Sequence, residues 1–124
     1  MSRVNNMETF RGELEKIENK YRELTGREMA KIYRPPEGRF SEKNLMFATE
    51  LGYKTVFWSF AYADWDNKNQ PDPEKAKEKI LSSTHNGAII LLHPTSETNA
   101  IMLKDLLDEW KKQGYRFETL DKIP

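Results

Sequence analysis

The alternation of helical and strand patterns is the feature that most constrains the fold of this chain. Amphipathic helical patterns cover about residues 7–24, 42–51, 73–83 and 97–113, and strand patterns cover 30–33, 54–60, 88–92 and 115–120. This order with short links predicts an α/β fold whose parallel strands are joined by helical crossovers. Four strands make either a small open sheet or half of a barrel, and the pattern leaves both open. The apolar run Ala88–Leu92 is typical of a parallel strand that is covered on both faces.

Capping residues mark the expected helix ends. Asn5, followed by Glu8 three residues later, predicts a capping-box start for the first helix, and Gly26 predicts a left-handed end. The other helices have expected caps at Ser41, Asp72 and either Thr95 or Ser96. The inward face of the last helix is expected to carry Ile101, Leu103, Leu106, Leu107 and Trp110.

Length and composition narrow the classes of protein. The 124 residues fit one small domain that spans 1–124, with 37% hydrophobic and 32% charged residues. Lysine plus arginine and aspartate plus glutamate number 20 each, so charge gives no reason to expect nucleic acid or an anionic membrane as partner. The chain has no cysteine, which excludes disulfides and thiolate metal sites. No apolar run is long enough for a membrane segment.

Three short motifs carry the residues that are suited to chemistry. They are Arg34-Pro35-Pro36-Glu37-Gly38, Asp64-Trp65 and Leu91-Leu92-His93-Pro94. Each motif lies at or just beyond the end of an apolar run. Because the carboxyl ends of parallel strands meet at one edge, where α/β folds carry their sites, we expect the three motifs to converge there.

His93 and Asp64 are the candidate acid–base pair. A lone histidine that ends a strand is more often structural, and a lone loop aspartate more often begins an Asx turn. The convergence of the motifs favours a functional role for both. If Asp64 reaches His93, its negative charge favours the imidazolium form, which can protonate a leaving amine.

Trp65 and Arg34 have two interpretations each, whereas Pro36 and Glu37 have one. Trp65 offers an apolar wall for a sugar ring, or packs in the core. Arg34 holds a carboxylate by a bidentate pair, or makes a surface salt bridge of little energetic value. Pro36 stiffens the loop and directs backbone N–H groups toward an oxyanion, and Glu37 is expected at the rim of the cleft. His85 lies at the opposite end of the His93 strand, so we expect it to be exposed or structural. Because the two histidines of the chain lie at opposite strand ends, we expect the chain to lack a histidine-rich zinc site of its own.

These motifs, in this order and spacing, resemble the later motifs of the polysaccharide deacetylases, which are also called the NodB homology fold or carbohydrate esterase family 4. The resemblance runs from about Arg34 to Leu120. Within the family, the phrases around Arg34-Pro35-Pro36, Gly52–Ser59 and Gly87–His93 look most like the peptidoglycan N-acetylmuramic acid deacetylases of spore cortex formation. The resemblance implies the C-terminal half of a distorted (β/α) barrel.

The resemblance also implies roles for the motif residues. Enzymes of this family hold zinc or another divalent metal with an aspartate and two histidines, use a second aspartate as base, and use a late histidine as acid. On this sequence the acid is His93 with Asp64 in support, and Arg34 orients the catalytic aspartate. Trp65 and Leu91 line the pocket for the acetyl methyl group.

The sequence departs from the family pattern in two respects. Many members of the family have an aspartate three residues before the position of Asp64, whereas this chain has Ala61 there. In this respect the chain resembles the muramic acid subgroup. The motifs that supply the base and the metal ligands are missing, so we expect no metal in this chain and negligible activity from it alone.

The leading hypothesis is therefore a truncated deacetylase that acts on peptidoglycan, with an extracellular or cell-wall location for the parent family in bacteria. One alternative is a non-catalytic α/β domain that binds glycan or protein. Another is a half-barrel that assembles with a second chain or with itself through unpaired strand edges.

Overall fold

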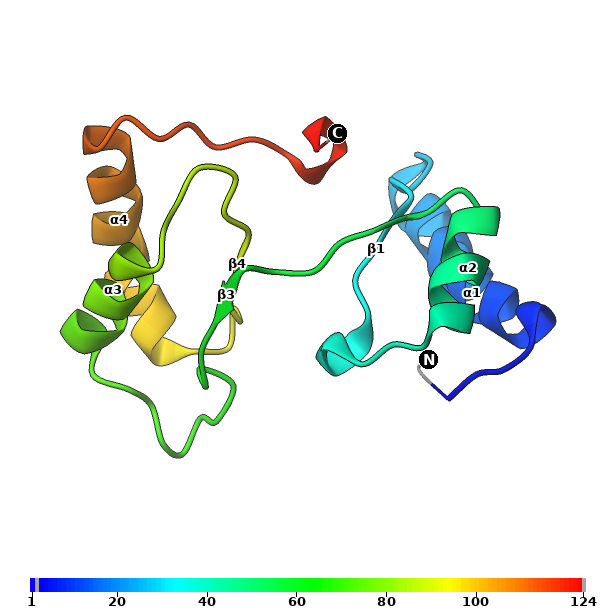
Figure 1. Cartoon of the computed structure of the whole chain (residues 1–124), viewed down its shortest axis with the longest axis horizontal. Helices are drawn as coiled ribbons and strands as arrows, with labels where there is room; N and C mark the ends of the chain where they lie inside the picture. Colours follow the sequence, from blue (N-terminus) through cyan, green and yellow to red (C-terminus); the bar gives the residue numbers. More distant parts are fainter. Residues whose placement is uncertain (2, 124) are drawn as a thin grey trace. The chain divides into compact units, whose positions relative to one another are not determined.

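The chain divides into two compact units in the computed structural model, which describes Met1 and residues 3–123. Unit 1 comprises Met1–Phe57 and the C-terminal residues from Thr119, and unit 2 comprises Trp58–Glu118. Helices alternate with short strands along the chain (Figure 1). Within the described part of the chain, no helix has the length and apolar character needed to cross a membrane.

Unit 1 packs two helices against one pair of parallel strands. The helices are α1 (Met7–Thr25) and α2 (Glu42–Glu50), and β1 (Ile32–Tyr33) pairs with β2 (Lys54–Thr55). A buried hydrophobic cluster in this unit comprises Phe10, Leu14, Tyr33, Ala48 and Tyr53. The fully buried Phe10 contributes on the order of 2–3 kcal/mol by leaving water. Ile17, Tyr21 and Leu24 lie further along α1 at helical spacing from Leu14, and all three are exposed.

Most of the expected helix caps are confirmed. Ser41 and Asp72 accept hydrogen bonds from backbone N–H groups of the first turns of α2 and α3, and Ser96, rather than Thr95, caps α4. Gly26 ends α1 with φ 68°. The first cap is a correction, because Asn6 and not Asn5 accepts the bond from the Thr9 N–H, at 2.8 Å.

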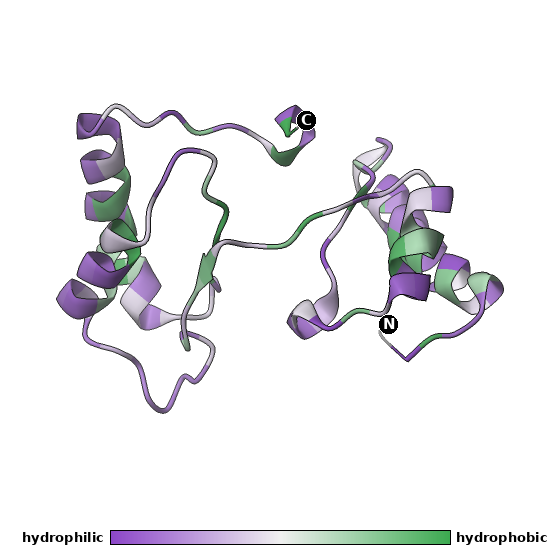
Figure 2. Cartoon of the chain, in the orientation of Figure 1, coloured by the Kyte–Doolittle hydropathy of each residue, from purple (hydrophilic) through white to green (hydrophobic). Residues whose placement is uncertain are grey.

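Unit 2, like unit 1, contains one pair of parallel strands and two helices. Strand β3 (Phe60–Ala61) pairs with β4 (Ile90–Leu91), and α3 (Pro73–Ser82) packs on α4 (Glu97–Lys112). The hydrophobic faces of α3 and α4 meet (Figure 2), and the core there comprises Ala76, Ile80, Met102, Leu106 and Trp110. The Trp110 indole donates to the Thr84 hydroxyl at 2.9 Å, so its polar atom is satisfied.

The parallel pairing of short strands is confirmed, whereas two strand predictions are wrong. The segment 54–60 forms two separate strands, because residues 54 and 55 pair with β1 and residue 60 pairs with β4. Residues 115–119 form no strand, and Leu120–Lys122 form a 3-10 turn. Phe117 packs instead on the edge of Trp110, with the ring centroids 5.9 Å apart. The two pairs form separate two-stranded sheets, and the partial barrel stays a prediction.

The inward face of α4 is rotated relative to the prediction. Ile101 and Leu103 are 60% and 40% exposed, whereas Met102 is buried together with the expected Leu106 and Trp110. The residue one turn before Met102 on this face is Asn99, which is 5% exposed. The buried stripe therefore begins with a polar side chain, which lies in the first turn of the helix.

Candidate active site

Asp64 and His93 meet in unit 2, as expected from the convergence of their motifs. Asp64 lies on the loop after β3, and His93 lies two residues beyond the end of β4, so the parallel pairing of the two strands brings them to the same edge. The Asp64 Oδ1 atom is 2.7 Å from the His93 Nδ1 atom, and its Oδ2 atom accepts from the His93 backbone N–H at 2.7 Å. The Asp64 side chain is completely buried, and that of His93 is 36% exposed.

This contact selects one tautomer of the neutral imidazole. An ionised carboxylate can only accept hydrogen bonds, so the His93 Nδ1 atom must carry the proton that lies between the two groups. The Nε2 atom is then the nitrogen that gains or loses a proton. The ring that carries Nε2 is partly exposed, and a general acid needs a proton donor that can reach a bound molecule.

The electrostatics of Asp64 favour the ionised form. Burial by itself raises the pKa of Asp64, but the His93 backbone N–H, the imidazole and the Asn99 amide donate to the carboxylate and hold the pKa below its ordinary value. The site thus keeps a fixed negative charge beside the His93 imidazole.

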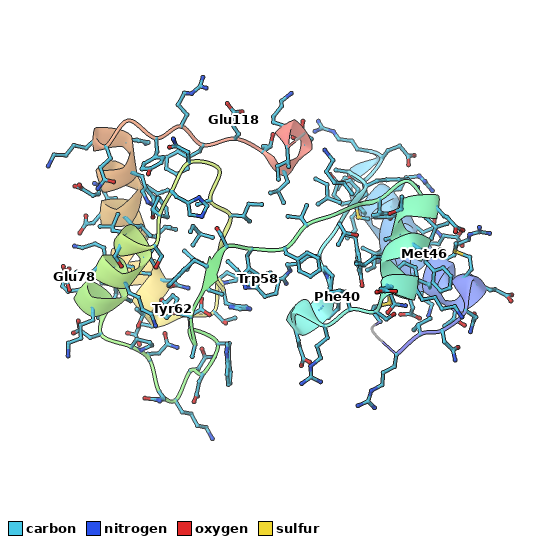
Figure 3. All side chains as sticks on the ribbon, viewed as in Figure 1. Phe40, Met46, Trp58, Tyr62, Glu78 and Glu118 are labelled. Carbon is cyan, nitrogen blue, oxygen red and sulfur yellow. The ribbon has the colours of Figure 1, made fainter. Side chains whose placement is uncertain are left out.

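Asn99 supplies the third hydrogen bond to Asp64. Its Nδ2 atom is 2.6 Å from the Asp64 Oδ2 atom and 3.1 Å from the His93 backbone oxygen. The Tyr62 hydroxyl donates to the Asn99 Oδ1 atom, and Tyr62 follows directly after β3 (Figure 3). Burial, and then the nearby charge of Asp64, raise the pKa of Tyr62, so its hydroxyl remains a donor at neutral pH.

Gln70 fixes the loop that carries Asp64. Its Nε2 atom donates to the backbone oxygens of Asp64 and Asp66 at 3.0 and 2.9 Å. Its Oε1 atom accepts from the Ser96 hydroxyl at 2.7 Å and from the Thr98 backbone N–H at 3.2 Å. A single side chain therefore joins the loop to the first turn of α4, where Asn99 also lies.

Trp65 and Leu91 lie beside the pair in the sequence but differ in exposure. Trp65 is 65% exposed, so it does not pack in the core, and its ring is available to a ligand. Leu91 ends β4 opposite Ala61 and is half-buried. Contact of either residue with an acetyl group stays a prediction.

The Arg34-Pro35-Pro36 loop belongs to unit 1, and its convergence with the His93 site stays a prediction. Arg34, Pro36 and Glu37 are exposed, and Pro35 is fully buried. Glu37 has φ 55°, a left-handed conformation, and its carboxylate is 3.3 Å from the guanidinium of Arg39. In the described part of the chain, the structure records no ion pair for Arg34.

No cluster of three or more histidine, aspartate or glutamate side chains that could hold a metal ion occurs among residues 1 and 3–123. His85 is exposed, as expected, and its Nδ1 atom is 3.0 Å from the Asn86 backbone oxygen. The donor set of the described residues therefore does not fit the zinc site that the family resemblance implies.

Comparison with known proteins gives relatives over nearly the whole chain. The sequence is 40% identical over 111 residues to the peptidoglycan-N-acetylmuramic acid deacetylase PdaA of Bacillus subtilis. It is 37% identical over 98 residues to a peptidoglycan-N-acetylglucosamine deacetylase of Bacillus cereus. The solved structure of PdaA, a family 4 carbohydrate esterase, matches with a TM-score of 0.88 at 39% identity over 94% of this chain. This chain is a homologue of the family 4 polysaccharide deacetylases.

The match covers only part of each relative. The aligned region spans 90% of this chain but 42% of PdaA, and 74% of this chain but 44% of the Bacillus cereus enzyme. It also covers 50% of the chain in the PdaA structure. No family model matches the sequence.

Asn99, Tyr62 and Gln70 were not predicted from the sequence as members of the site. The position of Asn99 was predictable from the helical spacing, because it precedes the buried Met102, Leu106 and Trp110 at intervals of three or four residues, which places it on the same face of α4. The incorrect phase assigned to α4 hid this signal. Tyr62 and Gln70 lie in a polar loop with no periodicity, so their partners follow only from the tertiary structure.

Proposed function

We propose that this chain carries the general-acid part of the active site of an enzyme that removes acetyl groups from peptidoglycan amino sugars. The observation that carries the proposal is the buried Asp64 carboxylate, whose Oδ1 atom is 2.7 Å from the Nδ1 atom of the partly exposed His93 ring. Relatives at 37–40% identity that are peptidoglycan deacetylases support it.

His93 performs the proton transfer in this proposal. Hydrolysis of the acetamide breaks the bond between the carbonyl carbon and the sugar nitrogen, and the departing nitrogen needs a proton. The imidazolium of His93 donates the Nε2 proton to that nitrogen and becomes neutral with its proton on Nδ1. Throughout the step, the Asp64 carboxylate holds Nδ1 and stabilises the charged form.

The finer proposal is that the sugar is N-acetylmuramic acid. The 40% identity to PdaA, whose name states that substrate, supports it. Trp65 would stack on the sugar, and Leu91 would contact the acetyl methyl group. Pro36 and Glu37 would lie along the glycan, and Arg34 would orient a carboxylate.

We also propose that the complete enzyme depends on zinc or another divalent metal, which would supply the activated water. The described residues do not provide a ligand set for it. The metal ligands and the aspartate base would come from outside this sequence. The chain alone is therefore expected to release negligible acetate from any glycan.

A chimera tests the proposed function. The segment of Bacillus subtilis PdaA that aligns with this chain is replaced by the chain itself, and acetate release is measured on a glycan that contains N-acetylmuramic acid and on a chitooligosaccharide. The chimera is expected to release acetate from the muramic glycan. H93Q should lower this rate by about 10²–10⁴-fold, whereas H85Q, the matched change at the exposed histidine, should leave it within about twofold of the unmodified chimera, since surface changes are small.

Two results would contradict parts of the proposal. If the chimera folds and releases no acetate under conditions in which PdaA does, or if H93Q keeps the full rate, the general-acid role is wrong. If release is as fast from the chitooligosaccharide, the muramic acid assignment is wrong and the deacetylase assignment stands.

A further inference from the structure

Asn99 contacts both members of the acid–base pair from the first turn of α4. One N–H of its carboxamide reaches the Asp64 carboxylate and another reaches the His93 backbone oxygen, at 2.6 and 3.1 Å. The Asn99 side chain is 5% exposed, so these bonds are shielded from water. The capping of α4 does not depend on this amide, because the Ser96 side chain is the cap.

We propose that Asn99 is a positioning residue for the acid, whose carboxamide orients the Asp64 carboxylate so that His93 keeps its proton on Nδ1. The inference rests on the proposed function of His93. It assigns to Asn99 no contact with substrate, and it makes Tyr62 the residue that orients the amide.

The orientation of the amide is determined by its partners. Its oxygen accepts from the Tyr62 hydroxyl, and its nitrogen faces the Asp64 Oδ2 atom and the His93 oxygen. The opposite orientation would place the amide oxygen against two other acceptors, the Asp64 carboxylate and the His93 backbone oxygen. All the donors and the acceptor of the carboxamide are therefore used in one arrangement only.

The effect of Asn99 on His93 follows from which donors each carboxylate oxygen of Asp64 accepts. The Oδ2 atom accepts from both Asn99 and the His93 backbone N–H, which leaves Oδ1 directed at the imidazole. Without the amide, one of the two bonds that hold Oδ2 is lost and the carboxylate can rotate. The Nδ1–H form of the imidazole is then favoured less strongly over the Nε2–H form.

The helix itself does not need the Asn99 side chain. The cap of α4 is the Ser96 hydroxyl, which accepts from the backbone N–H of Asn99 at 3.1 Å, and this bond survives a change of side chain. The neighbouring Thr98 gives a matched control. It is 2% exposed in the same turn and donates its hydroxyl to the backbone oxygen of Pro71, and no contact to Asp64 or His93 is recorded for its side chain among the described residues.

The test measures the tautomer of His93 by ¹⁵N NMR of the whole chain, at a pH where the imidazole is neutral and without metal or substrate. The chain has two histidines, and His85 serves as the internal reference. In the unmodified chain, His93 is expected to be predominantly Nδ1–H. N99L should lower the ratio of Nδ1–H to Nε2–H by about tenfold, which equals about 1.4 kcal/mol. Y62F should lower it less, and T98V should leave it unchanged.

The outcomes separate this proposal from a general loss of structure. An unchanged ratio in folded N99L, or an equal change in T98V, would overturn it. If N99L does not fold, Y62F decides, and an unchanged ratio there would overturn the proposal. Because the tautomer is measured without turnover, a failed chimera assay would refute the proposed function without altering this result.

Discussion

Replacing Asp64 by asparagine is the sharpest perturbation of the site, because it keeps the shape of the side chain and removes its charge. Asp64 is completely buried and accepts from three donors in the structure. Two of these donors meet at Oδ2, and neither can change role. The new amide must therefore place its oxygen at the Oδ2 position and its NH₂ group against the imidazole of His93.

The expected cost follows from the two bonds at Oδ2. Hydrogen bonds to a charged group contribute about 1.5–3 kcal/mol, and those between neutral groups about 0.5–1.5 kcal/mol. The two bonds, from the His93 backbone N–H and from Asn99, each lose roughly 1 kcal/mol, so D64N should lower the free energy of unfolding by about 2 kcal/mol at neutral pH. The third bond survives only if His93 changes its tautomer.

The tautomer of His93 should therefore invert in D64N. Its Nδ1 atom becomes the acceptor of the amide N–H, and Nε2 carries the proton of the neutral ring. The same ¹⁵N measurement that reports on Asn99 detects this inversion, with His85 again as reference. In this arrangement no carboxylate accepts a hydrogen bond from the imidazole.

Tryptophan fluorescence during urea unfolding measures the loss of stability in the relevant unit. All three tryptophans, Trp58, Trp65 and Trp110, belong to unit 2. With a urea dependence of about 2 kcal/mol per molar, a loss of about 2 kcal/mol moves the midpoint down by about 1 M.

The pH dependence gives a second check on Asp64. Because the pKa of Asp64 is lowered by folding, its contribution is present above the ordinary aspartate value of about 4 and is lost as the pH falls through the lower pKa of the folded state. The difference in stability between the two proteins should shrink over that window, since a protonated Asp64 is as neutral as asparagine. Equal stability at pH 7, together with His93 still protonated on Nδ1, would refute the electrostatic account of the site.

Three further predictions concern other parts of the structure. Q70A removes two hydrogen bonds within the Asp64 loop and two between that loop and the start of α4, so it should lower the stability of unit 2 by about 2 kcal/mol in the same fluorescence assay. No change would show that the loop is held by other contacts. Y53F removes the hydrogen bond that contributes most to the lowered pKa of Glu18, so the pKa of Glu18 should rise toward its ordinary value. The pKa is measured by ¹³C NMR. A pKa of Glu18 that stays low in Y53F would assign the shift to Lys31. G26A should destabilise the fold by about 1 kcal/mol and lower the melting temperature, because Gly26 has φ 68° at the end of α1. G12A lies within the same helix, where an added Cβ meets no atom within 4 Å, so it should stabilise the fold by about 1 kcal/mol and raise the melting temperature. Equal shifts in these two variants would contradict the assignment of the left-handed cap.

Features that depend on neighbouring residues were predictable from the sequence. A serine or aspartate before a helix caps it through a bond that spans three residues, so Ser41 and Asp72 could be assigned without knowledge of the fold. The same holds for the left-handed glycine at the end of α1. The meeting of Asp64 and His93 was also predictable, because parallel strands place their carboxyl ends at one edge.

Features that depend on distant partners were not predictable in the same way. Residues 115–120 have the composition of a strand, yet a strand forms only where another strand offers unpaired backbone groups, and the sequence does not show where that partner lies. The segment 54–60 changes partner within its length, from β1 to β4, which no local pattern records. The face of α4 was misjudged because Ile101 and Leu103 are as apolar as the residues that are buried.

The error in the face of α4 also explains why the third member of the site was missed. A periodic search for buried residues counts apolar side chains, and it discards an asparagine that lies on the inward face. Asn99 is buried there because its amide bonds are satisfied by Asp64, His93 and Tyr62. A polar residue in phase with a buried stripe, one turn before the first apolar member, is thus a signal for a buried hydrogen-bond network. In a chain whose strands end in an aspartate and a histidine, such a residue is the first candidate for the side chain that positions them.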